Sequence, residues 1–296
     1  MATFGDLVEE VLLNLEGFSG DQEIFGTLGA NILATDTTFT VAGPIFADGS
    51  GFSSGLVEIG EEMVYVQTFT RATGVATGVL RGWRGTTAAA ATAGTLLRNN
   101  PKFPRFAVKR AINDTVKGLA PKLYAIKKYS FVYKGGKVRY DMPVDAKDVL
   151  QVSTSVPGPS LTWRNNKRYS FDITGSNTVT TNPALDVWDG ITSRTVNVIY
   201  LGDPQPMVNL TDDFVTTTGL YDWAREIISF GASWRLSSFI DSSKININTS
   251  EQIASNQPIG SATNLSKYFL GMYQSRLNEG QLRAQNLYPV SKHYIQ

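Results

Sequence analysis

Few residues of this 296-residue chain could carry catalysis or hold a metal ion. The chain has no cysteine and a single histidine, His293, near the C-terminus. Thiolate chemistry is therefore excluded, and zinc or iron sites of the usual kinds lack ligands. Neighbouring carboxylates are the remaining candidates for acid–base chemistry: Glu9/Glu10, Glu61/Glu62, Asp186/Asp189 and Asp212/Asp213. Two carboxylates at a set separation suffice for glycoside hydrolysis, so Asp186 and Asp212 keep a glycosidase open as one hypothesis.

The better-supported interpretation of these carboxylates is that they are solvated surface groups without a catalytic role. Adjacent residues on a strand point to opposite faces, and acidic residues in loops are usually solvated. The sequence also contains no phosphate-binding loop of the GxxxxGK[ST] type. We therefore expect a protein that is not an enzyme and that uses no cofactor and no metal.

Charge is segregated along the chain, although the net charge is only +1. Residues 1–70 contain eleven acidic residues and no lysine or arginine, whereas residues 101–140 contain eleven basic residues and one acidic residue, Asp114. One interpretation is two solvated faces that balance within one fold. The other is a polar molecule that docks head to tail with copies of itself, onto a charged ring, or onto nucleic acid.

The stretch that organises the chain is PKFPRFAVKRAINDTVKGLAPKLYAIKK, residues 101–128. Pro104 suits a first helical turn, and Gly118 and Pro121 favour an end or a kink, so a helix is predicted over 104–120. Its apolar residues recur at steps of three and four and form one stripe: Val108, Ala111, Ile112, Val116 and Leu119. The basic face lacks interleaved aromatic residues, which favours contact with an acidic neighbour over sequence-specific DNA binding.

Three more segments have helical periodicity: residues 4–16, 219–240 and 264–286. Thr3-Phe4-Gly5-Asp6 resembles a capping signature at the start of the first. Between the helices, residues 31–98 and 129–206 are rich in strand formers and glycine turns. In the second of these regions, Lys134–Lys137 predicts a hairpin turn, and Trp163 and Trp188 are predicted to anchor the core.

These elements predict an α+β fold in which about four helices form one bundle that carries two inserted β modules, each a small barrel or sandwich. The helical, ring-forming domain is expected to be discontinuous and to comprise residues 1–17, 101–128 and 207–296. The first β module is expected over 18–100 and the second over 129–206. A string of independent domains is the alternative, but it would leave the first short helix without a partner.

The first β region contains the sequences VEIGEEMVYV, residues 57–66, and RGWRGTTAAAATAG, residues 81–94. Together they resemble a pattern of small β domains in tailed-phage virion proteins. The chain departs from the pattern at Ala91, where those domains often have histidine. An alanine side chain has no group for catalysis or metal binding, so both roles are excluded at this position. The second stretch has a structural explanation, because Gly82 and Gly85 permit tight turns of the backbone.

Three helical stretches have the sequences FGDLVEEVLLNLEG, FPRFAVKRAINDTVKGLAPKLY and SKYFLGMYQSRLNEGQLRAQNLYP. They resemble helices of the head-to-tail adaptor (connector) proteins of tailed bacteriophages. The resemblance implies a ring of twelve copies under the portal protein that extends the DNA channel, attaches the next neck or tail protein, lets double-stranded DNA pass without specific contacts, and performs no catalysis. The implied subunit or channel contacts are Glu9, Glu10, Glu16, Arg105, Lys109, Arg110 and Lys117. The tail with His293, Tyr294 and Ile295 is the candidate arm that grips the portal or a neighbour.

The alternative hypothesis is another virion component, a tail or baseplate protein whose β modules bind glycan through exposed tryptophans. The N-terminus, MATFGDLVEE, lacks a basic start followed by an apolar run, and no stretch approaches about 18 consecutive apolar residues. We therefore expect no signal peptide, no membrane helix, and assembly in a cytoplasm. The resemblance to phage adaptors implies a final place in the virion.

Overall fold

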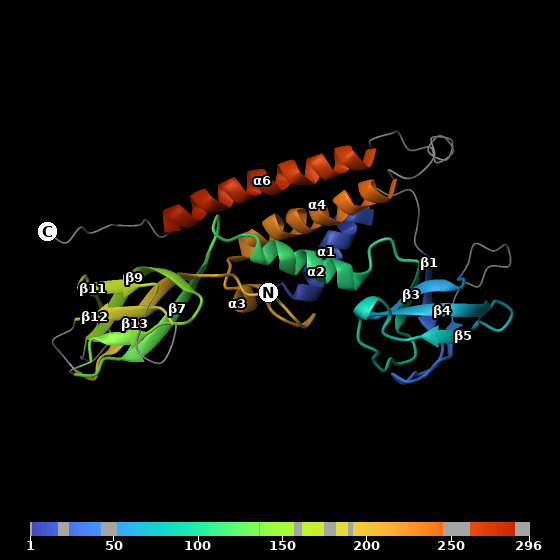
Figure 1. The fold of residues 1–296 in the computed structure, drawn as a ribbon, viewed down its shortest axis with the longest axis horizontal. Helices are drawn as coiled ribbons and strands as arrows, with labels where there is room; N and C mark the ends of the chain where they lie inside the picture. Colours follow the sequence, from blue (N-terminus) through green and yellow to red (C-terminus); the bar gives the residue numbers. More distant parts are fainter. Residues whose placement is uncertain are drawn as a thin grey trace. The chain divides into compact units, whose positions relative to one another are not determined.

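The computed structural model describes residues 2–16, 24–42, 52–135, 137–156, 162–174, 182–188, 192–244 and 261–287 (Figure 1). The chain divides into two compact units. One consists of Met1–Leu7, Ile112–Trp234 and Thr263–Gln296, and the other of Val8–Ala111 and Arg235–Ala262. The predicted division into one discontinuous helical domain and two β modules stays a prediction.

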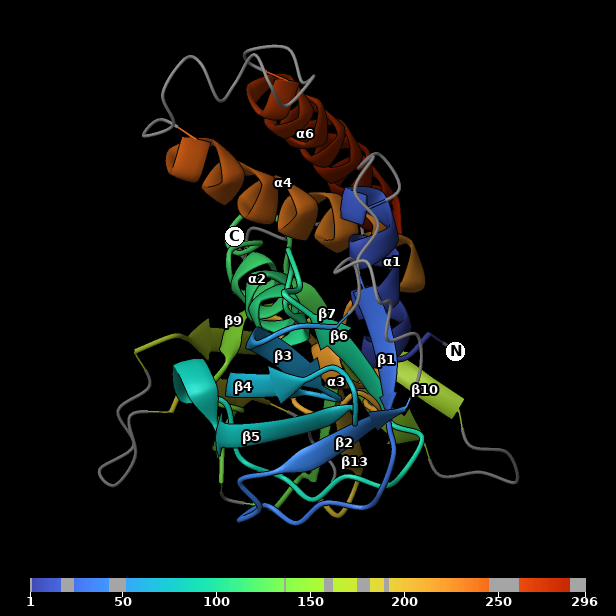
Figure 2. The same ribbon diagram turned by 90° about the vertical axis from the view of Figure 1, so that its right-hand side faces the viewer.

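The first β region closes into a barrel of six antiparallel strands (Figure 2). The strands are β1 (Ile24–Leu28), β2 (Phe39–Ala42), β3 (Gly55–Ile59), β4 (Glu62–Thr70), β5 (Val75–Leu80) and β6 (Leu96–Asn99). Their order is β1-β2-β5-β4-β3-β6, and β6 pairs with β1 to complete the ring of hydrogen bonds. Alternation sets the faces: Val64 and Val66 are buried in the barrel core, whereas Tyr65 between them is exposed. A 3-10 turn, η1 (Trp83–Gly85), follows β5.

The second β region consists of two antiparallel sheets. One has the order β10-β9-β13-β7 and the other β11-β12-β8. The strands are β7 (Ala125–Val132), β8 (Arg139–Asp141), β9 (Ala146–Val156), β10 (Thr162–Asn165), β11 (Tyr169–Asp172), β12 (Ala184–Val187) and β13 (Thr195–Gly202). The two sheets bury one common core, to which Val152 and Val198 contribute from the first and Leu185 and Val187 from the second. The region is therefore a small sandwich.

The helices are α1 (Phe4–Glu16), α2 (Arg105–Lys117), α3 (Phe214–Thr218), α4 (Arg225–Lys244) and α6 (Ser261–Leu287), with a 3-10 turn, η2 (Asp222–Ala224), before α4. The predicted helices 4–16, 104–120 and 264–286 are confirmed as α1, α2 and α6 to within a few residues. The capping signature is also confirmed, because the Asp6 N–H donates to Thr3 Oγ1 at 3.2 Å and the Thr3 N–H donates to Asp6 Oδ2 at 2.8 Å. The predicted helix 219–240 starts later, since Gly219 adopts the left-handed conformation, with φ of 73°, that ends α3.

The predicted fold class, a bundle of about four helices with two inserted β modules, is wrong. The structure is β-rich, with 34% of residues in strands and 33% in helices, and it contains a closed barrel and two further sheets. The physical reason is that each β region buries a core of its own. β regions that bury their own cores are principal parts of the fold, and they are not small insertions into a helical bundle.

The hairpin predicted at Lys134–Lys137 is wrong as well. β7 pairs with β13 along its whole length, whereas β8 pairs with β12 in the other sheet, so the loop between β7 and β8 crosses from one sheet to the other. Tyr140 organises this crossing. Its hydroxyl accepts from the Lys134 N–H at 2.8 Å and donates to the Lys137 carbonyl at 2.9 Å. A buried phenol with both kinds of hydrogen bond therefore takes the place of a tight turn.

Three helices approach closely at a glycine of α4. A Cβ added to Gly231 would lie 2.5 Å from Thr115 Cγ2 of α2 and 3.0 Å from the Tyr273 ring of α6. We expect Gly231→Ala to destabilise the protein by about 1–3 kcal/mol, since the Thr115 methyl group or the Tyr273 ring must shift to make room for the added Cβ. The matched control is Gly271→Ala on α6, where a Cβ meets nothing within 4 Å and alanine favours the helix by about 1 kcal/mol. Thermal unfolding of both variants checks the prediction, which fails if the two shift the melting temperature alike.

Candidate functional site

Two of the basic residues that the sequence singled out pair with acidic residues of the same chain. The Arg105 guanidinium forms an ion pair with the Glu9 carboxylate of α1, and Lys109 Nζ lies 2.9 Å from Glu61 Oε2 in the turn between β3 and β4. The Glu9 and Glu61 side chains remain 58% and 46% exposed. The acidic N-terminal part and the basic helix α2 therefore already attract each other within one subunit.

The other predicted interface residues have different placements. Arg110 and Lys117 of α2 are exposed, and Glu10 of α1 is half-buried. Glu16 is the last residue of α1, and its side chain lies outside the described residues. The predicted arm, with His293, Tyr294 and Ile295, lies wholly outside them.

A buried ion pair that the sequence did not single out links the barrel to the start of α2. Arg98 Nη1 of β6 donates to Glu58 Oε2 of β3 at 2.9 Å, and both side chains are less than 5% exposed. The other Glu58 oxygen, Oε1, accepts the backbone N–H of Arg105 at 2.5 Å. A carboxylate at the first turn of a helix stabilises its unsatisfied N–H groups. Burial raises the pKa of Glu58, against the opposing attraction of Arg98 and the hydrogen bond from Arg105.

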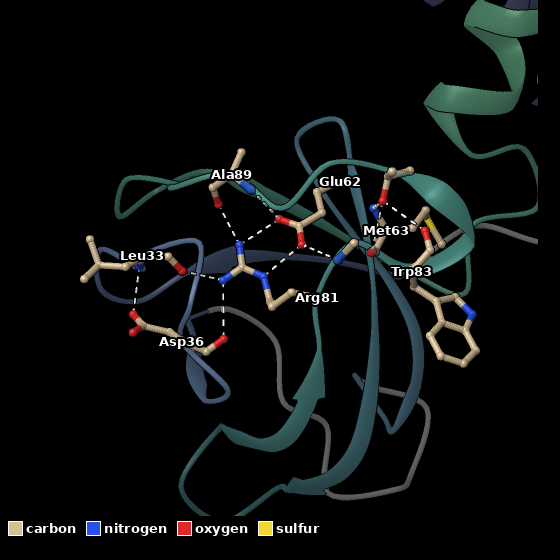
Figure 3. Close-up of polar contacts among 9 residues, drawn as sticks. Leu33, Asp36, Glu62, Met63, Arg81, Trp83 and Ala89 are labelled. Carbon is tan, nitrogen blue, oxygen red and sulfur yellow. Dashed lines mark hydrogen bonds and ion pairs between the residues drawn. The ribbon is translucent and has the colours of Figure 1, made fainter.

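The two sequence stretches 57–66 and 81–94 are joined by a second ion pair, between Glu62 of β4 and Arg81 after β5 (Figure 3). Arg81 Nε and Nη2 donate to the two oxygens of the Glu62 carboxylate at 2.9 and 2.7 Å. The same carboxylate accepts the backbone N–H groups of Gly82 at 2.8 Å and Ala89 at 3.1 Å. Arg81 also donates to the carbonyls of Leu33 and Ala89. The pair thus fastens three separate loops at one end of the barrel.

The electrostatics of this pair indicate a structural role. Burial by itself raises the pKa of Glu62, but the hydrogen bonds from Arg81, Gly82 and Ala89 outweigh burial and hold that pKa below its usual range. All the donors belong to the chain, so the carboxylate is a satisfied acceptor. The indole of Trp83 points away from the pair in Figure 3 and contacts the Tyr65 ring in a tilted arrangement, with ring centroids 5.3 Å apart.

The carboxylates named as catalytic candidates also have local structural contacts. Asp213 Oδ1 accepts the Thr216 N–H at 2.9 Å and caps α3. Asp212 Oδ2 accepts the backbone N–H groups of Val208 and Asn209 at 2.7 and 2.8 Å. Asp186 lies 3.9 Å from Arg139 Nε. Among the described residues, no group of three or more His, Asp or Glu side chains could hold a metal ion, and none of the described helices is long and apolar enough to cross a membrane.

The predicted core role of the two tryptophans is wrong. Trp163 is 40% exposed and Trp188 is 48% exposed. The smaller side chains Val152, Val196 and Val198 fill the sandwich core together with tyrosines. Sequence reasoning also missed Glu58 and Arg98. The signal available for them was a charged residue in an otherwise apolar strand, which is tolerated in a core only when it is paired.

No protein-family model and no curated protein matches this sequence.

Proposed function

We propose that the chain is a structural head-to-tail adaptor of a tailed phage. In this proposal, copies of the chain form a ring under the portal protein, extend the DNA channel and attach the next neck or tail protein. The proposal includes no catalytic step and no cofactor. Asp212 and Asp213, the adjacent carboxylates nearest to a helix start, accept backbone hydrogen bonds there, which supports a structural use.

The observation that carries the proposal is the separation of charge between elements that keep it at the surface. Glu9 and Glu61 each pair with a basic residue of α2 in the same chain, yet their side chains stay about half exposed, and Arg110 and Lys117 are exposed on α2. A closed ring has head-to-tail contacts, so each subunit must carry two different, complementary surfaces. Opposite charges on different elements of one chain meet this requirement. They attract a neighbouring subunit in the orientation that closes a ring, and like charges repel it in other orientations.

The test is the assembly state of the full chain. We expect light scattering and negative-stain imaging to show rings, twelve-fold if the resemblance holds, that bind the isolated portal protein. The double variant Arg110→Glu/Lys117→Glu is expected to reduce the ring fraction at least about tenfold, since each reversal replaces attraction by repulsion. Rings of the unaltered chain should also loosen as salt screens the contact.

The control is Lys128→Glu on β7, an exposed residue with the same change of charge per site. It should leave the ring fraction unchanged. A monodisperse monomer that does not bind a portal ring would contradict the proposal, as would rings that are indifferent to the charge of α2.

A second candidate is a tail or baseplate protein whose β modules bind glycan. The observation that favours it is the exposure of Trp163 and Trp188 on the sandwich. Exposed indoles are large apolar surfaces with a polar edge, and they are enriched where proteins contact ligands.

A further inference from the structure

An open groove on the sandwich collects positive charge. It has a volume of about 480 Å³ and is lined by four basic residues, an indole and amide groups. The residues that carry the argument are Arg164, Lys167, Arg168, Arg194, Trp188 and Asn166. No acidic residue is among the described residues that line it. Asp172 of β11 and Asp186 of β12 form ion pairs with Arg139.

The backbone around the groove is held in place by hydrogen bonds from both sheets. The Asn166 N–H donates to the Val152 carbonyl of β9 at 2.8 Å, and its side-chain Nδ2 donates to the Trp188 carbonyl at 3.3 Å. The Asn166 Oδ1 accepts the Arg168 N–H at 2.8 Å, and the Trp188 N–H donates to the Arg168 carbonyl at 3.1 Å. The turn that follows β10 and the residue that follows β12 are thus joined. A site held this way loses little conformational freedom when it binds a ligand.

We propose that this groove binds an acidic oligosaccharide, a short sugar chain that bears carboxylate or phosphate groups. Guanidinium groups bind both anions through two parallel hydrogen bonds, and three of the four cations here are arginines. The exposed face of Trp188 offers an apolar platform for a sugar ring, and the side-chain amide of Asn165, which also lines the groove, suits hydroxyls. The volume is that of a pocket for a ligand of a few rings.

Single-stranded nucleic acid fits these observations less well. Proteins that bind it stack successive bases on several aromatic side chains along a charged groove. Trp188 is the only aromatic residue among the described residues that line this groove. Trp163, the neighbour of Arg164 on β10, points to the opposite face of the strand by the alternation of side chains. Nucleic acid is therefore the competing outcome of the test.

The test measures binding to the full chain by calorimetry with three probes: trigalacturonic acid, neutral maltotriose and a short oligothymidylate. We expect trigalacturonic acid to bind, to bind more weakly as salt is added, and to exceed both other probes in affinity. Arg164→Glu and Trp188→Ala are each expected to weaken its binding about tenfold or more. Lys128→Glu and Trp163→Ala, which match them in chemistry outside the groove, should change it by less than about twofold.

Every outcome of this binding experiment either supports the proposed ligand class or contradicts it. Equal affinity for maltotriose would show that charge does not select the ligand, and tighter binding of oligothymidylate would assign the groove to nucleic acid. If the full chain is folded, as its circular dichroism spectrum shows, and does not bind trigalacturonic acid, the proposal is overturned. The inference deepens the second candidate function and does not depend on ring assembly, so a failure to form rings and a failure to bind saccharide are separate results.

Discussion

Replacing Arg81 with methionine is expected to destabilise the barrel by about 3–5 kcal/mol at neutral pH. The substitution keeps the volume of the side chain but leaves the Glu62 carboxylate, whose side chain is 3% exposed, without its cation. Removing one partner of a buried ion pair has an effect of this size because the remaining charge is uncompensated. Urea unfolding followed by circular dichroism measures it, and hydrogen exchange at Gly82 and Ala89, whose N–H groups donate to Glu62, localises it.

The stability difference between Arg81→Met and the unaltered chain is expected to change with pH in a defined direction. In the unaltered chain the pKa of Glu62 lies below its usual value of 4.5, so its contribution to stability is present above about pH 4.5 and is lost as the pH falls through the folded-state pKa. In Arg81→Met, burial prevails and the pKa rises, so the variant loses stability as the pH rises above about 4.5. The gap between the two proteins should therefore widen from pH 4 to pH 7.

The control for this experiment is Arg84→Met. Arg84 is an exposed cation in the turn that directly follows Arg81-Gly82. Its loss should change the free energy of unfolding by less than about 0.5 kcal/mol. A gap that is equal for the two variants, or that does not depend on pH, would show that the Glu62–Arg81 pair does not hold the loops together.

Replacing Arg98 with methionine is expected to destabilise the protein by a similar amount, and Glu58→Gln in the same chain is expected to restore part of it. The restoration follows because a neutral amide at position 58 needs no cation, and its oxygen can still accept the Arg105 N–H. A double-mutant cycle measured by urea unfolding should therefore be non-additive by at least about 1 kcal/mol. Exchange of the first amides of α2 should be faster in Arg98→Met than in the double variant.

The titration of Glu58 has the opposite sign from that of Glu62. Its pKa is raised in the folded chain, so its contribution to stability is present below about pH 4.5 and is lost as the pH rises through the folded-state pKa. Arg98→Met should steepen that loss, and the double variant should abolish it. Lys109→Met is the control, because the partly exposed Lys109–Glu61 pair should contribute at most about 1 kcal/mol. Additive energies in the cycle would contradict the assigned role of the buried pair.

The two buried pairs show where sequence reasoning stopped. The glycines at 82 and 85 were assigned to turns from their residue type, and both have positive φ in the structure. The sequence did not indicate that Glu62 would receive hydrogen bonds from Arg81, Gly82 and Ala89, since these contacts span 19 to 27 residues. Pairing over such separations depends on barrel closure, which no local pattern encodes.

The sequence by itself determined the elements whose causes are local. The stripe of Val108, Ile112 and Val116 and the Thr3–Asp6 cap specify α2 and the start of α1, because helical hydrogen bonds and caps join residues only a few positions apart.

The tertiary structure alone decided the balance between helices and sheets, the pairing of β7 with β13, and the exposure of Trp163 and Trp188. The reason is that a strand has no hydrogen-bond partner of its own. Which strand it joins, and which of its faces is buried, are set by competition among all the strands for the same core.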